Sequence, residues 1–178
     1  MTENKNPFLK PYNTPHDTAP FHLIKIEHYE PALLEGMKEQ NEEIDAIVNN
    51  PEAPTFQNTI VALEKSGALL DRVTTVFGNL MSAETSDEMQ ELAEKMMPVL
   101  SEHSNNISLN EKLFARIKAV YEQKRPVTTE KVKDAQLLQK TYDGFVRSGA
   151  NLTGEAKEKF RQLNTELSIL TYVFLRIC

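Results

Sequence analysis

The chain has 178 residues, a formal net charge of −6 and a hydrophobic content of 40%. This length suits one domain or one piece of a larger protein, and the hydrophobic content is enough for a folded core and excludes wholesale disorder. The acidic balance excludes a broad electrostatic surface for nucleic acid, which needs a surplus of Lys and Arg. The single cysteine, Cys178, excludes a disulfide within the chain and a cysteine-rich zinc site.

The sequence gives no signal for export or membrane insertion. Residues 1–6 contain no apolar segment of a signal peptide, and no stretch reaches the roughly 18 apolar residues of a membrane span. We therefore expect a cytoplasmic protein, with the periplasm as the alternative if a signal peptide has been removed. Neither nucleic acid nor a membrane is expected as a partner.

The N-terminal residues differ from the rest in their proline content. Residues 1–27 hold four of the nine prolines, and proline lacks an N–H donor and disfavours helix in the residue before it. This predicts an extended arm over 1–27, followed by a helical domain over 28–178. The arm is expected to be anchored by the apolar residues near its end: Phe21, Leu23, Ile24 and Ile26.

Beyond the arm the pattern is helical throughout, because apolar residues recur every three or four positions and glycine is scarce. We predict an all-α array of about six mostly antiparallel helices. Their expected ranges are 29–48, 55–80, 85 to Pro98, 108 to Pro126, 129–148, and 153 onward. The short connection between the first two predicts an antiparallel helical hairpin.

Particular residues predict where these helices begin, end or pack. Thr85–Glu88 and Ser108–Glu111 both match the capping-box pattern of a helix start. Pro98 should kink or end its helix, and Gly149 suits the position just after a helix C-terminus. Gly67 lies on the apolar stripe of the long second helix, where it would permit close approach of a neighbour.

The histidine pattern does not predict a metal site. The four histidines are His16, His22, His28 and His103, and none lies in a His-Glu-x-x-His or Glu-x-x-His string, which would place two ligands on one helix face. The predicted sets of catalytic and metal-binding residues are therefore empty, and substrate-binding residues are left unassigned. No cofactor is expected in this chain.

Two other groups of residues have ordinary structural interpretations. The paired carboxylates, Glu42 with Glu43 and Glu88 with Glu91 and Glu94, predict solvated helix faces, because a catalytic carboxylate needs burial that shifts its pKa. The methionines Met89, Met96 and Met97 predict core packing, with an adaptable partner surface as the alternative.

Four ordered strings are more distinctive than these patterns: 20–32, 54–67, 110–117 and 145–152. In this order and spacing they resemble the N-terminal part of the thimet oligopeptidase family of zinc metallopeptidases. Within the family they look most similar to the bacterial peptidyl-dipeptidases (dipeptidyl carboxypeptidases) and oligopeptidase A. The resemblance covers about 7–171.

The resemblance implies a function for a longer protein. Members of the family are several times longer, almost entirely helical, and enclose a channel in which zinc, held by His-Glu-x-x-His and a downstream Glu, hydrolyses short peptides. This chain has no positions that match those ligands. By resemblance it is a non-catalytic scaffold and channel-wall segment that is inactive alone, while zinc and short peptides belong to the parent enzyme.

The end of the chain departs from the family pattern. The run 172–178 is abruptly apolar, which suggests a truncated or frameshifted product whose uncovered surface would favour self-association. One alternative is a stand-alone helical module that binds a partner protein or peptide through its apolar faces. Another is assembly with a separate polypeptide that carries the zinc site.

Overall fold

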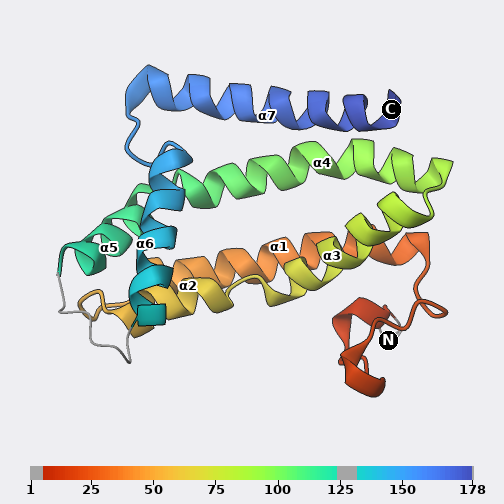
Figure 1. Cartoon of the computed structure of the whole chain (residues 1–178), viewed down its shortest axis with the longest axis horizontal. Helices are drawn as coiled ribbons and strands as arrows, with labels where there is room; N and C mark the ends of the chain where they lie inside the picture. The colour runs from red at the N-terminus through yellow and green to blue at the C-terminus, as the bar shows by residue number, and fades with distance from the viewer. Residues whose placement is uncertain (1–5, 124–131, 178) are drawn as a thin grey trace. The chain divides into compact units, whose positions relative to one another are not determined.

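The computed structural model describes residues 6–123 and 132–177, without the side chains of 172–177. These residues form helices and turns and contain no strand, which confirms the predicted all-α class (Figure 1). They divide into two compact units. The first unit comprises residues 6–42 and 67–96, and the second comprises 43–66 and 97–177.

The helical elements are, in chain order, η1 (Pro7–Leu9), η2 (Pro15–Asp17), α1 (Ile26–Val48), the π-helix η3 (Phe56–Val61), α2 (Ala62–Lys65), α3 (Ala68–Ala83), α4 (Asp87–Ser108), α5 (Glu111–Glu122), α6 (Val132–Arg147) and α7 (Gly154–Ile177). None of the described helices combines the length and apolar character that a membrane span requires. The expected helix end at Pro126 and helix start at residue 129 lie outside the described residues.

The N-terminal arm is less extended than predicted, because it contains the short 3₁₀ turns η1 and η2. Its anchor also differs from the prediction. Phe21 and Leu23 are more than half exposed, whereas Phe8 is fully buried. Asn6 fixes η1 by accepting a hydrogen bond from the Phe8 N–H at 3.1 Å and donating one to the carbonyl of His28 at 2.7 Å. The first proline-flanked turn therefore packs into the core, while at the end of the arm Ile24 and Ile26 are partly buried.

The core of the first unit is built around an aromatic series. The ring of Tyr29 on α1 lies 5.0 Å from that of Phe8 and 5.2 Å from that of Phe77 on α3, measured between centroids. Tilted pairs at this separation are favourable beyond the area they bury. The exposed ion pair between Lys95 on α4 and Glu30 on α1, at 2.6 Å, joins a third helix to this core.

The helices α1 and α3 approach each other closely in the antiparallel direction that the sequence predicts. A Cβ atom at Gly36 would lie 2.9 Å from the backbone of Leu70, and one at Gly67 would lie 2.6 Å from Cδ of Gln40. Residue 36 of α1 thus lies beside residue 70 and residue 40 lies beside residue 67, as expected for antiparallel segments. The expectation that Gly67 permits close approach is borne out by its contact with Gln40.

The predicted single helix over 55–80 is wrong. The structure divides it into η3, α2 and α3. The break between α2 and α3 falls at Gly67, whose φ of +76° leaves the right-handed helical region, whereas η3 passes directly into α2. Glycine reaches this conformation without the steric cost that other residues have. The apolar stripe continues across the break, so the hydrophobic pattern alone could not reveal it.

Two expectations about helix boundaries can be compared with the structure. Of the two outcomes expected at Pro98, a kink or a helix end, the end is excluded, since α4 continues to Ser108. Proline removes only one intrahelical hydrogen bond, and the buried residues Met96 and His103 pack on either side of it. The capping box at 108–111 is absent, because Ser108 is still helical and the side chain of Asn110 caps α5 instead.

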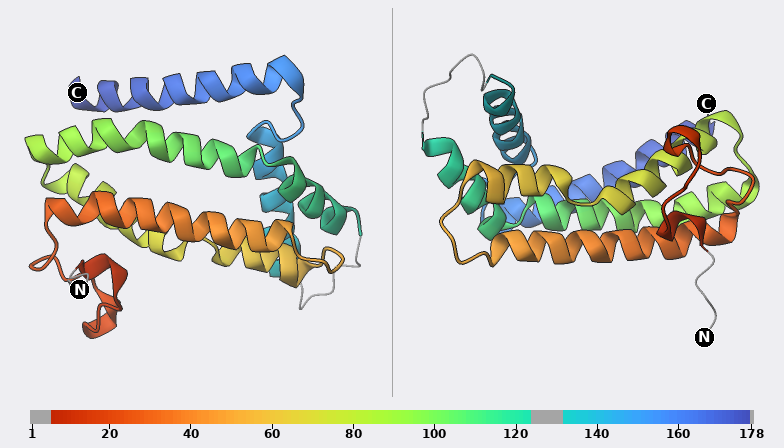
Figure 2. Two further views of the ribbon diagram at one scale, coloured as in Figure 1. Left: turned by 180° about the vertical axis from the view of Figure 1, so that it is seen from behind. Right: turned by 90° about the horizontal axis from the view of Figure 1, so that it is seen from below.

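The second unit has an aliphatic core between the end of α1, η3 and α5. It is formed by Ile44, Ile47, Ile60, Leu113, Ile117 and Val120. Figure 2 shows η3 and α2 running back along the end of α1. Aromatic stacking joins α6 to α5, with the rings of Tyr121 and Tyr142 centred 4.0 Å apart.

The predicted C-terminal glycine of α6 is confirmed. Gly149 has a φ of +83°, and the N–H groups of Gly149 and Ala150 donate to the carbonyls of Val146 and Phe145 at 3.1 and 3.0 Å. This is the Schellman arrangement, which satisfies carbonyls left open at a helix end. It also turns the chain toward α7.

Two glycine substitutions test the close approach of α1 and α3. Gly36→Ala should destabilise the protein by about 1–3 kcal/mol, because the new methyl group meets the backbone of Leu70. Gly78→Ala is the matched control on α3, where nothing in the described part of the chain lies within 4 Å. It should stabilise by up to about 1 kcal/mol through helix propensity. Urea unfolding measures both, and equal effects would contradict the packing.

A second test uses the buried histidine of α4. Burial lowers the pKa of His103 from its usual 6.5, so near this pH the unfolded chain binds a proton that the folded chain does not. Above pH 6.5 His103 is neutral in both the folded and the unfolded chain and costs no unfolding free energy. As the pH falls below 6.5, proton binding to the unfolded chain lowers the unfolding free energy. We expect His103→Asn to reduce the loss of unfolding free energy between about pH 7.5 and about pH 5.5. An unchanged pH slope would show that another group is responsible.

Candidate functional site

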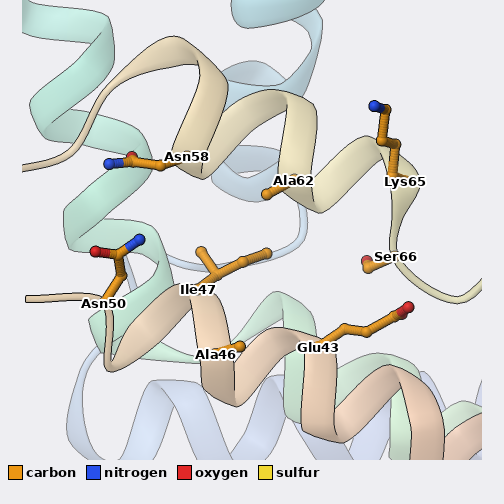
Figure 3. Close-up of a pocket in the computed structure, with 8 residues that line it drawn as sticks. All are labelled: Glu43, Ala46, Ile47, Asn50, Asn58, Ala62, Lys65 and Ser66. Carbon is orange, nitrogen blue, oxygen red and sulfur yellow. The ribbon is translucent and has the colours of Figure 1, made fainter. Parts of the chain in front are cut away.

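The second unit contains a small open pocket between the end of α1 and the pair η3–α2 (Figure 3). Its volume is about 320 Å³, near the lower limit for small-molecule sites. The lining residues are Glu43, Ala46, Ile47, Asn50, Asn58, Ala62, Lys65 and Ser66.

The pocket exists because small side chains face one another across it. Figure 3 shows Ala46 and Ile47 on α1 opposite Ala62 on α2, with the polar residues toward the two ends. Alanine leaves space that a larger side chain would fill, while Ile47, which is 5% exposed, forms an apolar floor. The middle of the pocket is therefore apolar.

The polar groups of the pocket do not form a catalytic arrangement. Ser66 donates its hydroxyl hydrogen to the carbonyl of Leu63 at 2.7 Å, and the lining contains no histidine or cysteine to act as base or nucleophile. Glu43 and Lys65 are both exposed to solvent. Such a pocket could hold an apolar group beside charges, but it offers no means of breaking a bond.

The amide of Asn58 stabilises one end of the pocket. Thr55 and Asn58 form a reciprocal capping box, in which the Asn58 oxygen accepts from the Thr55 N–H at 2.8 Å and the Thr55 hydroxyl accepts from the Asn58 N–H at 3.1 Å. The same amide oxygen accepts from the hydroxyl of the fully buried Thr59 at 2.9 Å, and the amide nitrogen donates to the carbonyl of Ala53 at 3.0 Å. The side chain thus fixes both η3 and the loop before it.

Arg116 extends this network from α5 to the same loop. Its guanidinium donates to the carbonyls of Asn50 and Glu52 at 3.0 and 3.3 Å, and to the Asn58 amide oxygen at 3.4 Å. Gln123 adds a bond to the carbonyl of Pro54 at 2.9 Å. Because a guanidinium offers several donors in a fixed plane, one residue can hold successive carbonyls of a loop.

This network explains two of the distinctive sequence strings. Asn58 belongs to 54–67 and Arg116 belongs to 110–117, and the structure brings these strings together through their side chains. Asn110, at the start of the second string, caps α5 by accepting from the Leu113 N–H at 3.0 Å. The roles visible here are the capping of helices and the fixing of a loop.

The lining of the pocket contains none of the four histidines, and of the carboxylates singled out from the sequence it contains Glu43. His16 and His22 are exposed, and His28 accepts a hydrogen bond from the Lys25 N–H through Nδ1 at 3.0 Å. The paired carboxylates lie at the surface, and of these only Glu43 reaches the pocket rim. Met89 and Met96 are buried in the first unit, which agrees with core packing.

In the part of the chain that the structure describes, no three His, Cys, Asp or Glu side chains gather as a metal site would require. Cys178 lies outside the described residues.

Comparison with known proteins gives relatives over nearly the whole chain, although no family model matches it. The dipeptidyl carboxypeptidase of Salmonella typhimurium is 43% identical over 169 residues, covering 95% of this chain and 25% of that protein. Oligopeptidase A of Escherichia coli is 26% identical over 165 residues, or 93% of this chain. A thimet-like oligopeptidase of Dictyostelium discoideum is 27% identical over 157 residues. The chain spans about a quarter of the length of these relatives.

Substitution of Asn58 tests whether its amide fixes the loop. Asn58→Ala leaves the buried Thr59 hydroxyl and the Thr55 N–H without their acceptor, and we expect a loss of about 2–3 kcal/mol in unfolding free energy. The exposed neighbour Gln57 provides the control, since Gln57→Ala should change stability by less than about 0.5 kcal/mol. Urea denaturation followed by circular dichroism distinguishes them. Equal midpoints for the two variants would contradict the role of Asn58.

Proposed function

We propose that this chain forms a non-catalytic helical segment of a peptidase of the thimet oligopeptidase family, because it is homologous to the N-terminal region of dipeptidyl carboxypeptidase and oligopeptidase A. In this role it supplies scaffold and part of the wall of a channel that admits short peptides. The observation that carries the proposal is the match to dipeptidyl carboxypeptidase over 95% of the chain. Peptide hydrolysis belongs to the whole enzyme.

The internal chemistry of the chain supports a structural role. The strings that resemble the family contain helix caps, a loop held by Arg116, and the glycine that ends α6. The pocket beside Asn58 has no nucleophile paired with a base. A segment whose distinctive residues hold helices in place can shape a channel without touching the reacting bond.

Zinc enters the proposal only through the parent enzyme. The metal would activate the attacking water in the part of the enzyme that carries the His-Glu-x-x-His string, and this chain has no such string. The residues of this chain would hold neither the metal nor the proton transferred during hydrolysis.

The proposal also implies that the chain has some tendency to associate with itself. A segment that packs against other parts of a protein exposes apolar surface when it stands alone, and such surface favours association. Leu163, Leu167 and Leu170 on α7 are each more than half exposed. We infer weak self-association of the isolated chain.

An activity assay in two contexts tests this proposed function. The isolated chain, supplied with zinc, should not cleave an internally quenched oligopeptide above the buffer rate. An exchange protein, in which residues 7–171 replace the matching quarter of the Salmonella typhimurium dipeptidyl carboxypeptidase, should cleave it.

Either of two results would contradict the proposal. Zinc-dependent cleavage by the isolated chain, abolished by a chelator, would show that the segment is itself catalytic. A folded exchange protein without activity would show that this chain cannot replace the corresponding region.

A further inference from the structure

The helix α7 meets the rest of the second unit through polar side chains. Lys157 pairs with Glu111 on α5 at 2.7 Å, Arg161 hydrogen-bonds Asn106 on α4, and Asn164 donates to the Asn105 amide oxygen at 3.0 Å. These three residues of α7 are four and three positions apart, so they share one helix face. The Lys157 side chain is only 13% exposed. The face of α7 toward α4 and α5 is therefore lined by polar side chains, while Phe160 on the same helix lies against Gly149.

The apolar face of the same helix points away from these contacts. Leu163, Leu167 and Leu170 are 53%, 61% and 64% exposed, and their spacing of four and three places them in one stripe, which we call the leucine stripe. At 100° per residue the stripe lies about a third of a turn from the polar face. An amphipathic helix normally buries its apolar face, so this arrangement is inverted.

The inversion identifies the leucine stripe as an interaction surface. Its three leucines are each more than half exposed, and exposed apolar side chains gathered on one helix face favour a partner. Their spacing fits the seam of a helix pair. Because the polar face already has partners, a helix could cover the stripe without breaking any contact that α7 makes within the unit. The matching partner is therefore an amphipathic helix with an apolar seam of its own.

A second copy of this chain fits the stripe poorly. In a two-fold antiparallel pair in which Leu163 of each copy faces Leu170 of the other, the two-fold axis passes between Glu166 and Leu167. The flanking Glu166 residues of the two copies then lie within about one residue of each other along the seam. Like charges beside a helical seam oppose pairing. Three leucines per copy also provide less area than the roughly 800 Å² per partner of a stable interface.

We propose that the leucine stripe docks against a helix in the part of the peptidase that lies outside the matched quarter. The relatives extend over about four times the length that this chain matches, so they contain chain that can supply such a helix. The inference rests on the proposed function and adds to it the surface through which the segment joins the rest of the enzyme. It assigns to Leu163, Leu167 and Leu170 a role in assembly.

The test compares two variants in the exchange protein and in the isolated chain. The triple variant Leu163→Gln, Leu167→Gln and Leu170→Gln removes the stripe. The control is Ile169→Gln, because Ile169 is 42% exposed on the same helix but points away from the stripe. Circular dichroism of the isolated chain should show unchanged helix content for both, since neither alters a contact within the unit.

In the exchange protein the triple variant should lower the unfolding temperature and reduce peptide cleavage at least about tenfold, while Ile169→Gln should leave both unchanged. An unchanged unfolding temperature in the triple variant would overturn the docking inference. Because this temperature is readable without activity, an exchange protein that folds but does not cleave peptides would contradict the proposed function alone.

Sedimentation of the isolated chain tests whether a second copy of the chain covers the leucine stripe. We expect association weaker than about 10 μM that the triple variant abolishes. A dimer tighter than about 1 μM that depends on the stripe would overturn the proposal, because it would make a second copy the natural partner.

Discussion

The amide of Asn58 is the polar group on which the second unit depends. It completes the cap of η3, binds the hydroxyl of the buried Thr59, and meets the guanidinium of Arg116 from α5. These bonds fix the loop between α1 and η3, and the fixed loop lets the aliphatic core between α1, η3 and α5 close. The pocket at the end of α1 results from the same arrangement, because Ala46 and Ala62 then face each other.

The sequence predicts the fold class and most helices because an apolar period of three or four residues requires a buried helix face. It predicts the role of Gly149 because few residues tolerate a positive φ after a helix. The break at Gly67 was not predictable, since the stripe runs through it and only the tertiary contact with Gln40 distinguishes it. The continuation of α4 through Pro98 likewise depends on packing. The pocket was not predicted either, because it forms where the end of α1 meets η3 and α2, and local sequence patterns do not show which segments meet.

The homology relates this chain to part of a peptidase. The contacts show that Asn58, Arg116 and Asn110, which lie in the distinctive strings, cap helices and hold a loop. The helix α7 adds what the sequence did not: its polar face is turned inward and its leucines outward. A helix with this polarity is expected in a segment that is one layer of a larger assembly.

The central claim is that this chain acts as one segment of a larger peptidase. The most direct measurement is the intact mass of the polypeptide in its source cells, detected with an antibody raised against residues 7–171. The account predicts a species several times heavier than the 20.2 kDa of this chain, co-purifying with zinc-dependent peptidase activity. A single species of 20.2 kDa without associated peptidase activity would contradict it.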